Sequence, residues 1–173
     1  LFLVFALAGG AEAQPWSAGA YAGGVLHALS HALAKAALFL AAGLVIASLG
    51  HDRIDGFAGL YRRMPVTVFS IALAAVTLMG LPPSGGFVAK YLLLTAAASG
   101  GQPLWAFALV GGGLLSALYL FRPLSRMMAR GEGEVTAERF RPREALPLAL
   151  AGAAILLGLA SAEPYRLIET GRA

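Results

Sequence analysis

The stretch HALSHALAKAALFLAAG, residues 27–43, places two histidines and a lysine four residues apart among Ala, Leu, Phe, Ser and Gly. In an α-helix, His27, His31 and Lys35 would turn by only about 40° and rise by about 6 Å per step. The three side chains would therefore form one stripe roughly 12 Å long on a single face. The apolar surroundings predict a membrane-spanning helix over about 24–48, with Lys35 near the bilayer centre.

The composition of the whole chain also indicates a membrane protein. Hydrophobic residues make up 58% of the 173 residues and charged residues only 13%, against about 25% charged residues in an ordinary soluble domain. Because backbone groups that face lipid must be paired within their own segment, we expect an all-α, polytopic transmembrane helix bundle. The other predicted helices cover about 66–80, 82–99, 104–124 and 145–160, with 1–8 as the end of a preceding helix.

We expect these helices to form a single transmembrane domain over 1–173. The chain opens on an apolar run that has neither an initiator Met nor a basic segment before it, which is not typical of a signal peptide. We therefore take the sequence as the C-terminal fragment of a longer integral membrane protein, in the inner (plasma) membrane of a bacterium.

Several kinds of site are excluded by missing residue types. The chain has no cysteine, which excludes disulfides, thiolate metal sites and iron–sulfur ligation, so we expect no redox centre in it. His27 and His31 lack the glutamate of an HExxH pattern and a third ligand, so neither a metal nor a cofactor is predicted. The arginines flank apolar runs and form no basic stripe with aromatic residues, so nucleic acid is not an expected partner.

All arginines and carboxylates lie in predicted loops or at helix ends, where arginines act as topology signals. If each predicted helix crosses the membrane once, the arginines before 66–80 and those before 145–160 fall on opposite faces. The first group is Arg53, Arg62 and Arg63, joined by Arg166 and Arg172, and the second is Arg122, Arg126, Arg130, Arg139, Arg141 and Arg143. The denser second group favours a cytoplasmic connection between 104–124 and 145–160.

Both lysines of the chain, by contrast, lie deep in predicted helices. A charge at such depth costs at least about 2.5–3.5 kcal/mol, which favours a functional explanation. A lysine stem reaches only about 6 Å while either interface is roughly 15 Å away, so snorkelling is excluded. A desolvated ammonium loses its proton readily, and imidazole exchanges protons near neutral pH. We therefore predict a proton relay made of the intramembrane titratable side chains His27, His31, Lys35 and Lys90.

A second motif, GLPPSGGFVAKYLLL over residues 80–94, puts two prolines and two glycines just before Lys90. Irregular backbone at membrane depth is tolerated only where it is buried in protein or lines a wet cavity. A simple tight turn between helices is the alternative, but it does not account for Lys90. We expect Lys90 at the same depth as Lys35, in a lateral line of titratable groups.

Accessory positions are predicted around this line. Ser30 lies beside the stripe and could help to hold a water molecule, and Ser116 and Tyr119 are placed to face a polar interior. The glycines of the later helices are interpreted as helix-packing positions, namely Gly111, Gly112, Gly113, Gly152 and Gly158.

The two motifs, HALSHALAKAALFLAAG followed about forty residues later by GLPPSGGFVAK, resemble those of a known family. They are similar to the antiporter-like proton-conducting membrane subunits of NADH:quinone oxidoreductase, membrane-bound hydrogenases and multisubunit Na+/H+ antiporters. The resemblance implies a fold of fourteen helices with two inverted five-helix repeats, each with one broken helix. Residues 1–8 would end the ninth helix, and the five later helices would be the tenth to fourteenth, with Lys90 on a broken helix.

The resemblance also implies that Lys35 and Lys90 are protonatable residues of the second half-channel and that His27 and His31 belong to the polar axis that connects them. The first repeat is absent from this chain, so a complete transport path cannot lie within it. The expected function is proton translocation as a subunit of an NADH:quinone oxidoreductase-type complex, with other membrane subunits and the lipid bilayer as partners.

Three alternatives stay open. The chain could belong to a multisubunit antiporter or a membrane-bound hydrogenase, with sodium as a coupling ion. It could be a purely structural membrane subunit, whose polar groups only fix helix packing. A small-molecule transporter would also use a broken helix at the midplane, but no aromatic or carboxylate set for an organic substrate is evident near the two motifs.

Overall fold

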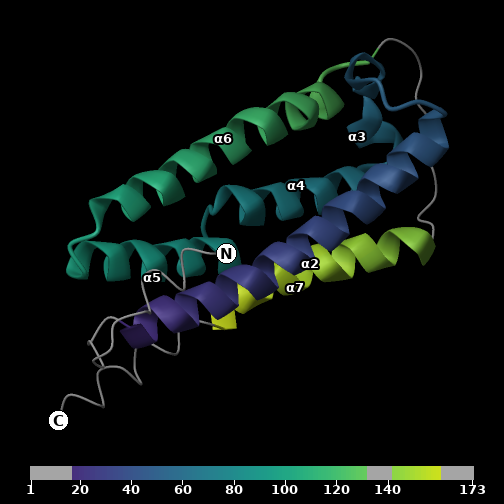
Figure 1. Ribbon diagram of the computed structural model, residues 1–173. Coiled ribbons are helices and arrows are strands. Elements are labelled where there is room, and N and C mark those ends of the chain that lie inside the picture. Colours follow the sequence, from purple (N-terminus) through teal and green to yellow (C-terminus); the bar gives the residue numbers. More distant parts are fainter. Residues whose placement is uncertain (1–16, 132–141, 161–173) are drawn as a thin grey trace.

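The computed structural model describes residues 17–131 and 142–160, and all regular elements in these ranges are helices (Figure 1). The helices are α2 (Ser17–Leu49), η1 (Ile54–Phe57), α3 (Leu60–Arg63), α4 (Pro65–Met79), α5 (Gly85–Ser99), α6 (Pro103–Met128), η2 (Pro142–Glu144) and α7 (Ala145–Ala160). The chain forms an all-α membrane helix bundle. The helix predicted over 1–8 and the arginines Arg166 and Arg172 lie outside the described residues.

The long helices differ most from the prediction at their ends. Helix α2 begins at Ser17 rather than near 24, because the small residues that precede Gly24 continue the helix without a break. Helix α6 continues to Met128 rather than ending near 124, with Pro123 inside it. Among the described residues, three helical segments are long and apolar enough to cross a membrane: Ala18–Leu49, Pro103–Met128 and Pro142–Ala160.

Helices α4 and α5 are shorter, with 15 residues each. Each is about 22 Å long, which is less than the roughly 30 Å of a hydrocarbon core. They run in the same direction, one after the other, along the antiparallel α2 (Figure 1). Val68 at the start of α4 shares a core cluster with Val45, whereas Leu93 in α5 shares one with Ala20. Together they form one broken span.

This arrangement corrects the prediction that 66–80 and 82–99 are two spans joined at a membrane face. The joining turn lies halfway along the bundle, where Gly85 packs against Ser30 of α2. Gly80 ends α4 in the left-handed conformation with φ of 77°, and its N–H donates to the carbonyls of Val76 and Thr77. Glycine adopts this conformation without the steric cost that other residues carry.

Helix α5 starts after the two prolines rather than with them. Ser84 is its N-cap, and its hydroxyl oxygen accepts a hydrogen bond from the N–H of Phe87 at 3.2 Å. The same hydroxyl donates to the carbonyl of Leu81 at 2.7 Å. One buried serine therefore closes the turn and satisfies a helix N-terminus in the interior of the bundle, where water is scarce.

Because α4 and α5 follow one another along α2, the connections before α4 and before α7 lie at the same end of the bundle. The N–H of Gly59 donates to the carbonyl of Ala129 at 2.8 Å, which joins the two connections directly. The prediction that Arg53, Arg62 and Arg63 lie opposite the connection before α7 is therefore wrong. Counting the break as a crossing inverted the side of every loop before it.

The core is built on small residues of α2. Ala34, Ala37 and Ala41 are fully buried, and they let α4 and α7 approach closely. The opposite helix, α6, packs against α4 and α5 and leaves much of its apolar surface exposed. The space between α2, α5 and α6 is where the polar residues meet.

Candidate functional site

A cavity of about 210 Å³ lies between α2, α5 and α6 and contains the predicted relay. Its lining includes every residue of the predicted relay and two polar residues of α6: His27, His31, Lys35, Lys90, Ser116 and Tyr119. The volume is sufficient for several water molecules, and the polar lining supplies hydrogen-bond partners for them. The structure thus brings residues of three helices together around one cavity. The most distant of them in the sequence, His27 and Tyr119, are 92 positions apart, the difference between 27 and 119.

The stripe on α2 has the geometry that a helix imposes on residues four apart. The ring centroids of His27 and His31 are 5.8 Å apart, and the rings are tilted by 32°. The Nδ1 atom of His27 is buried and has no hydrogen-bond partner within the described ranges. The Nζ atom of Lys35 lies 5.7 Å from the ring centroid of Phe39, a cation–π distance.

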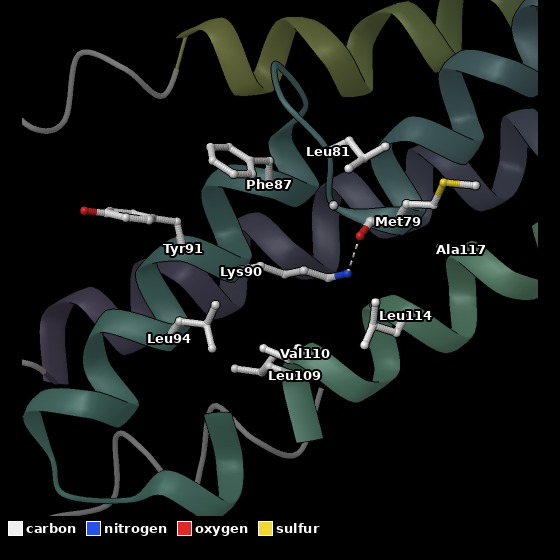
Figure 2. A pocket seen from close by; sticks show the side chains of 12 residues that line it. Met79, Leu81, Phe87, Lys90, Tyr91, Leu94, Leu109, Val110, Leu114 and Ala117 are labelled. Atoms are coloured by element: carbon white, nitrogen blue, oxygen red, sulfur yellow. Dashed lines mark hydrogen bonds between the residues drawn. The ribbon is translucent and has the colours of Figure 1, made fainter. Parts of the chain in front are cut away.

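Lys90 reaches from α5 back to the C-terminal end of α4 (Figure 2). Its Nζ donates to the carbonyl of Met79 at 2.8 Å and, more weakly, to that of Leu78 at 3.5 Å. The carbonyls of Val76 and Thr77 accept from the N–H of Gly80, and that of Val76 also from Leu81. All four terminal carbonyls of α4 are therefore satisfied, two of them by Lys90.

This position exposes the Lys90 amino group to two opposing influences. The C-terminal end of α4 carries about half a negative charge, which favours an ammonium. The apolar surroundings favour a neutral amine, because desolvation penalises charge. A neutral amine keeps two N–H donors, so it can still bind both carbonyls. The cap on α4 is therefore compatible with either protonation state.

A second cavity, of about 280 Å³, is also lined by Lys90 (Figure 2). It is almost entirely apolar, with Phe87, Leu94 and Leu114 among its lining residues. Lys90 and Gly113 border both cavities. The amino group thus stands at the boundary between a polar space and an apolar one.

Ser30 does not line either cavity. Its hydroxyl is fully buried and donates to the backbone carbonyl of His27 at 3.3 Å, on the side of α2 that faces Gly85. Tyr119 lines the polar cavity but is 52% exposed, so it lies at the cavity edge. Within the described ranges, no three His, Cys, Asp or Glu side chains are close enough to hold a metal ion.

Two glycines of α6 that the sequence analysis interpreted as helix-packing positions border the polar cavity. Gly112 and Gly113 line the polar cavity, and a Cβ at Gly111 or Gly112 would meet nothing within 4 Å. Gly112 lies four residues before Ser116 and seven before Tyr119, which places these three on one helix face. This spacing is the feature of the sequence that could have identified a cavity-lining glycine in α6.

Comparison with known proteins agrees with the geometry. A sequence family described as NADH:quinone oxidoreductase/Mrp antiporter, TM, matches residues 13–116. NADH-quinone oxidoreductase subunit N of Desulforudis audaxviator is 37% identical over 120 residues, which cover 69% of this chain and 24% of that protein.

Two further relatives are a subunit of another dehydrogenase and a different NADH-quinone oxidoreductase subunit. F(420)H(2) dehydrogenase subunit N of Methanosarcina mazei is 30% identical over 149 residues, 79% of this chain and 30% of that protein. NADH-quinone oxidoreductase subunit L of Rickettsia typhi is 35% identical over 99 residues, 57% of this chain and 15% of that protein. The chain thus spans less than a third of the length of these curated relatives.

Proposed function

The chain belongs to the NADH:quinone oxidoreductase/Mrp antiporter transmembrane family, and on this premise we propose that it relays protons in a membrane subunit of an NADH:quinone oxidoreductase-type complex. The observation that carries the proposal is the shared polar cavity, which joins His27, His31 and Lys35 of α2 to Lys90 of α5. The remaining helices of the subunit, the neighbouring membrane subunits and the redox chemistry belong to the rest of the complex.

In this proposal, protons pass along α2 through the histidines to the lysines. The imidazoles of His27 and His31 exchange protons in sequence, because their rings are one helical turn apart and border the same cavity. Water in the cavity bridges the longer steps to Lys35 and Lys90. The side chains bind, hold and release the proton, and the partner subunits supply the driving force.

Lys90 is the switching group in this scheme. Its amino group is held between the negative end of α4, which favours the charged form, and an apolar cavity, which favours the neutral form. A charge that approaches or leaves in a neighbouring subunit changes this balance and loads or unloads the proton. Because the cap on α4 is kept in both forms, the backbone need not rearrange during the cycle.

One observation favours a second candidate, the purely structural subunit. Lys90 satisfies two carbonyls at a helix end, which is a structural task in itself. This candidate leaves the stripe on α2 unexplained, because Lys35 donates no hydrogen bond to any residue of the described ranges. The two candidates predict different results for the same variant.

The test uses inverted membrane vesicles that contain the full-length subunit in its complex, with Lys90→Met compared with the parent. NADH-driven acidification and sodium-driven proton release are measured side by side, together with the amount of assembled complex. We expect assembled complex to lose the part of NADH-driven acidification that this subunit contributes. Loss of only the sodium-driven signal would indicate an antiporter, and unchanged transport in both assays would indicate a structural subunit.

We also propose an orientation for the subunit in a bacterial inner membrane. Within the described ranges, all arginines lie at the end of the bundle that holds the connections before α4 and α7, and the opposite end carries no charged residue. Positively charged loops are retained in the cytoplasm. The arginine-bearing end is therefore assigned to the cytoplasmic face, and the α5–α6 turn to the opposite face.

A further inference from the structure

We infer that Gly113 of α6 is a positioning residue for the amino group of Lys90, an inference that rests on the function proposed above. The inference concerns a residue that makes no hydrogen bond of its own to Lys90. It acts through the space that its missing side chain leaves.

The amino group of Lys90 occupies a narrow niche between α4 and α6. On one side, Nζ donates to the carbonyl of Met79 at 2.8 Å. On the other side, a Cβ atom at Gly113 would lie 2.9 Å from Nζ, closer than real Cβ atoms approach other heavy atoms. A Cβ at 113 would therefore displace Nζ from its position between the end of α4 and the two cavities.

The constraint on the residue at 113 comes from the Lys90 side chain rather than from the backbone of α6. The backbone of Gly113 lies inside a regular α-helix, where alanine is the more favourable residue. A Cβ there would lie 3.5 Å from the carbonyl oxygen of Met79 and 4.0 Å from Cε of Lys90, which are ordinary contacts. Only Nζ would have to move, and it is the flexible end of a side chain.

The neighbouring glycine provides a matched control. Gly111 lies in the same helix, lines neither cavity, and would have no neighbour within 4 Å of an added Cβ. The change Gly111→Ala therefore alters the backbone preference of α6 by the same amount as Gly113→Ala, without touching Lys90.

The experiment compares Gly113→Ala and Gly111→Ala in the full-length subunit within its complex, and measures protons translocated per electron in inverted vesicles. We expect Gly113→Ala to lower the part of this ratio that the subunit contributes by about tenfold or more, since displacement of a reacting group by a fraction of an ångström to one ångström has effects of this size. Gly111→Ala should stay within about twofold of the parent. A parental ratio for Gly113→Ala, beside loss of translocation in Lys90→Met, would overturn the inference and leave the proposed function intact.

A second measurement separates positioning from general packing. In Lys90→Met the side chain ends at the position of Cε, so the collision with a Cβ at 113 is removed. In the Lys90→Met background, Gly113→Ala should then raise the melting temperature as much as Gly111→Ala does. With Lys90 present, Gly113→Ala should raise the melting temperature less than Gly111→Ala does, or lower it.

The double variant Gly113→Ala with Lys90→Met also tests the inference if Gly113→Ala alone does not assemble. If Gly113→Ala does not assemble but Gly113→Ala with Lys90→Met does, the contact with Lys90 is the cause and the inference holds. If Gly113→Ala has the same effect on assembly and melting temperature with either residue at 90, the position serves packing alone and the inference is wrong.

Discussion

Lys90 performs two tasks with one amino group, and this has consequences for stability that Lys35 does not share. Its Nζ satisfies the carbonyls of Met79 and Leu78 at the end of α4. Lys35, by comparison, lies near the Phe39 ring and caps no helix within the described ranges. Two lysines that look equivalent in the sequence are therefore different in the structure.

We predict that Lys90→Met lowers the melting temperature of the solubilised complex more than Lys35→Met does. The reason is that methionine leaves two carbonyls of α4 without a donor, at a cost of about 1–3 kcal/mol for each one that water does not reach. Equal melting temperatures for the two variants would contradict the assignment of Lys90 as the cap on α4.

Ser30 supplies a prediction of no effect on transport. Its hydroxyl donates to the carbonyl of His27 on the side of α2 away from the polar cavity. We expect Ser30→Ala to leave proton translocation within about twofold of the parent, because the relay side chains keep their positions. A large loss in vesicle assays, with normal assembly, would show that Ser30 takes part in the relay.

At this scale the sequence predicted which titratable side chains line one cavity, but not which glycines of α6 border it, and the relay itself stays a prediction. The stripe His27, His31 and Lys35 follows from helical periodicity alone. The task of Gly113 depends on where the Lys90 side chain ends, which is a tertiary contact between α5 and α6. No local pattern contains that information.

At the scale of the elements, the broken span of α4 and α5 is the feature that organises the site. The break brings a helix C-terminus, a helix N-terminus and Lys90 together halfway along the bundle. The sequence showed the breaking residues, but Gly, Pro and Ser also make turns at a membrane face. What distinguishes the two cases is the packing of α4 and α5 along α2.

Helix α7 is held against the break through Gly158. A Cβ at Gly158 would collide with the backbone of Pro83, Ser84 and Gly85, whereas a Cβ at Gly152 would meet nothing within 4 Å. We predict that Gly158→Ala lowers the melting temperature, by an amount typical of overpacking at about 1–3 kcal/mol. Gly152→Ala serves as the control and should be neutral or slightly stabilising, by up to about 1 kcal/mol. Equal effects of the two changes would show that α7 does not pack against the break.

At the scale of the whole molecule, the single crossing of the broken span sorts the charges by side. The arginines of the connections before α4 and α7 meet at one end, as the hydrogen bond from Gly59 to Ala129 shows. The sequence analysis gave each apolar segment its own crossing, whereas α4 and α5 lie one after the other along α2 in the structure. Side assignments alternate along the chain, so one miscounted crossing inverted the placement of Arg53, Arg62 and Arg63.

Cysteine labelling tests this topology, because the chain contains no cysteine of its own. Asp52 and Ser99 are exposed and lie at opposite ends of the bundle. With all other cysteines of the full-length subunit removed, we expect Ser99→Cys to react with a membrane-impermeant maleimide in intact cells, and Asp52→Cys to react only in inverted vesicles. Labelling of both from the same side would contradict the single crossing.

The central claim is that the polar cavity between α2, α5 and α6 carries protons, and Lys35→Met tests it most directly, because Lys35 lines the cavity without capping a helix. The measurement is protons translocated per electron in inverted vesicles that contain assembled complex. We predict that the ratio falls by the fraction of protons that this subunit translocates, while the melting temperature stays close to that of the parent. A parental ratio in fully assembled complex would show that the stripe in HALSHALAK is structural and that protons take another path.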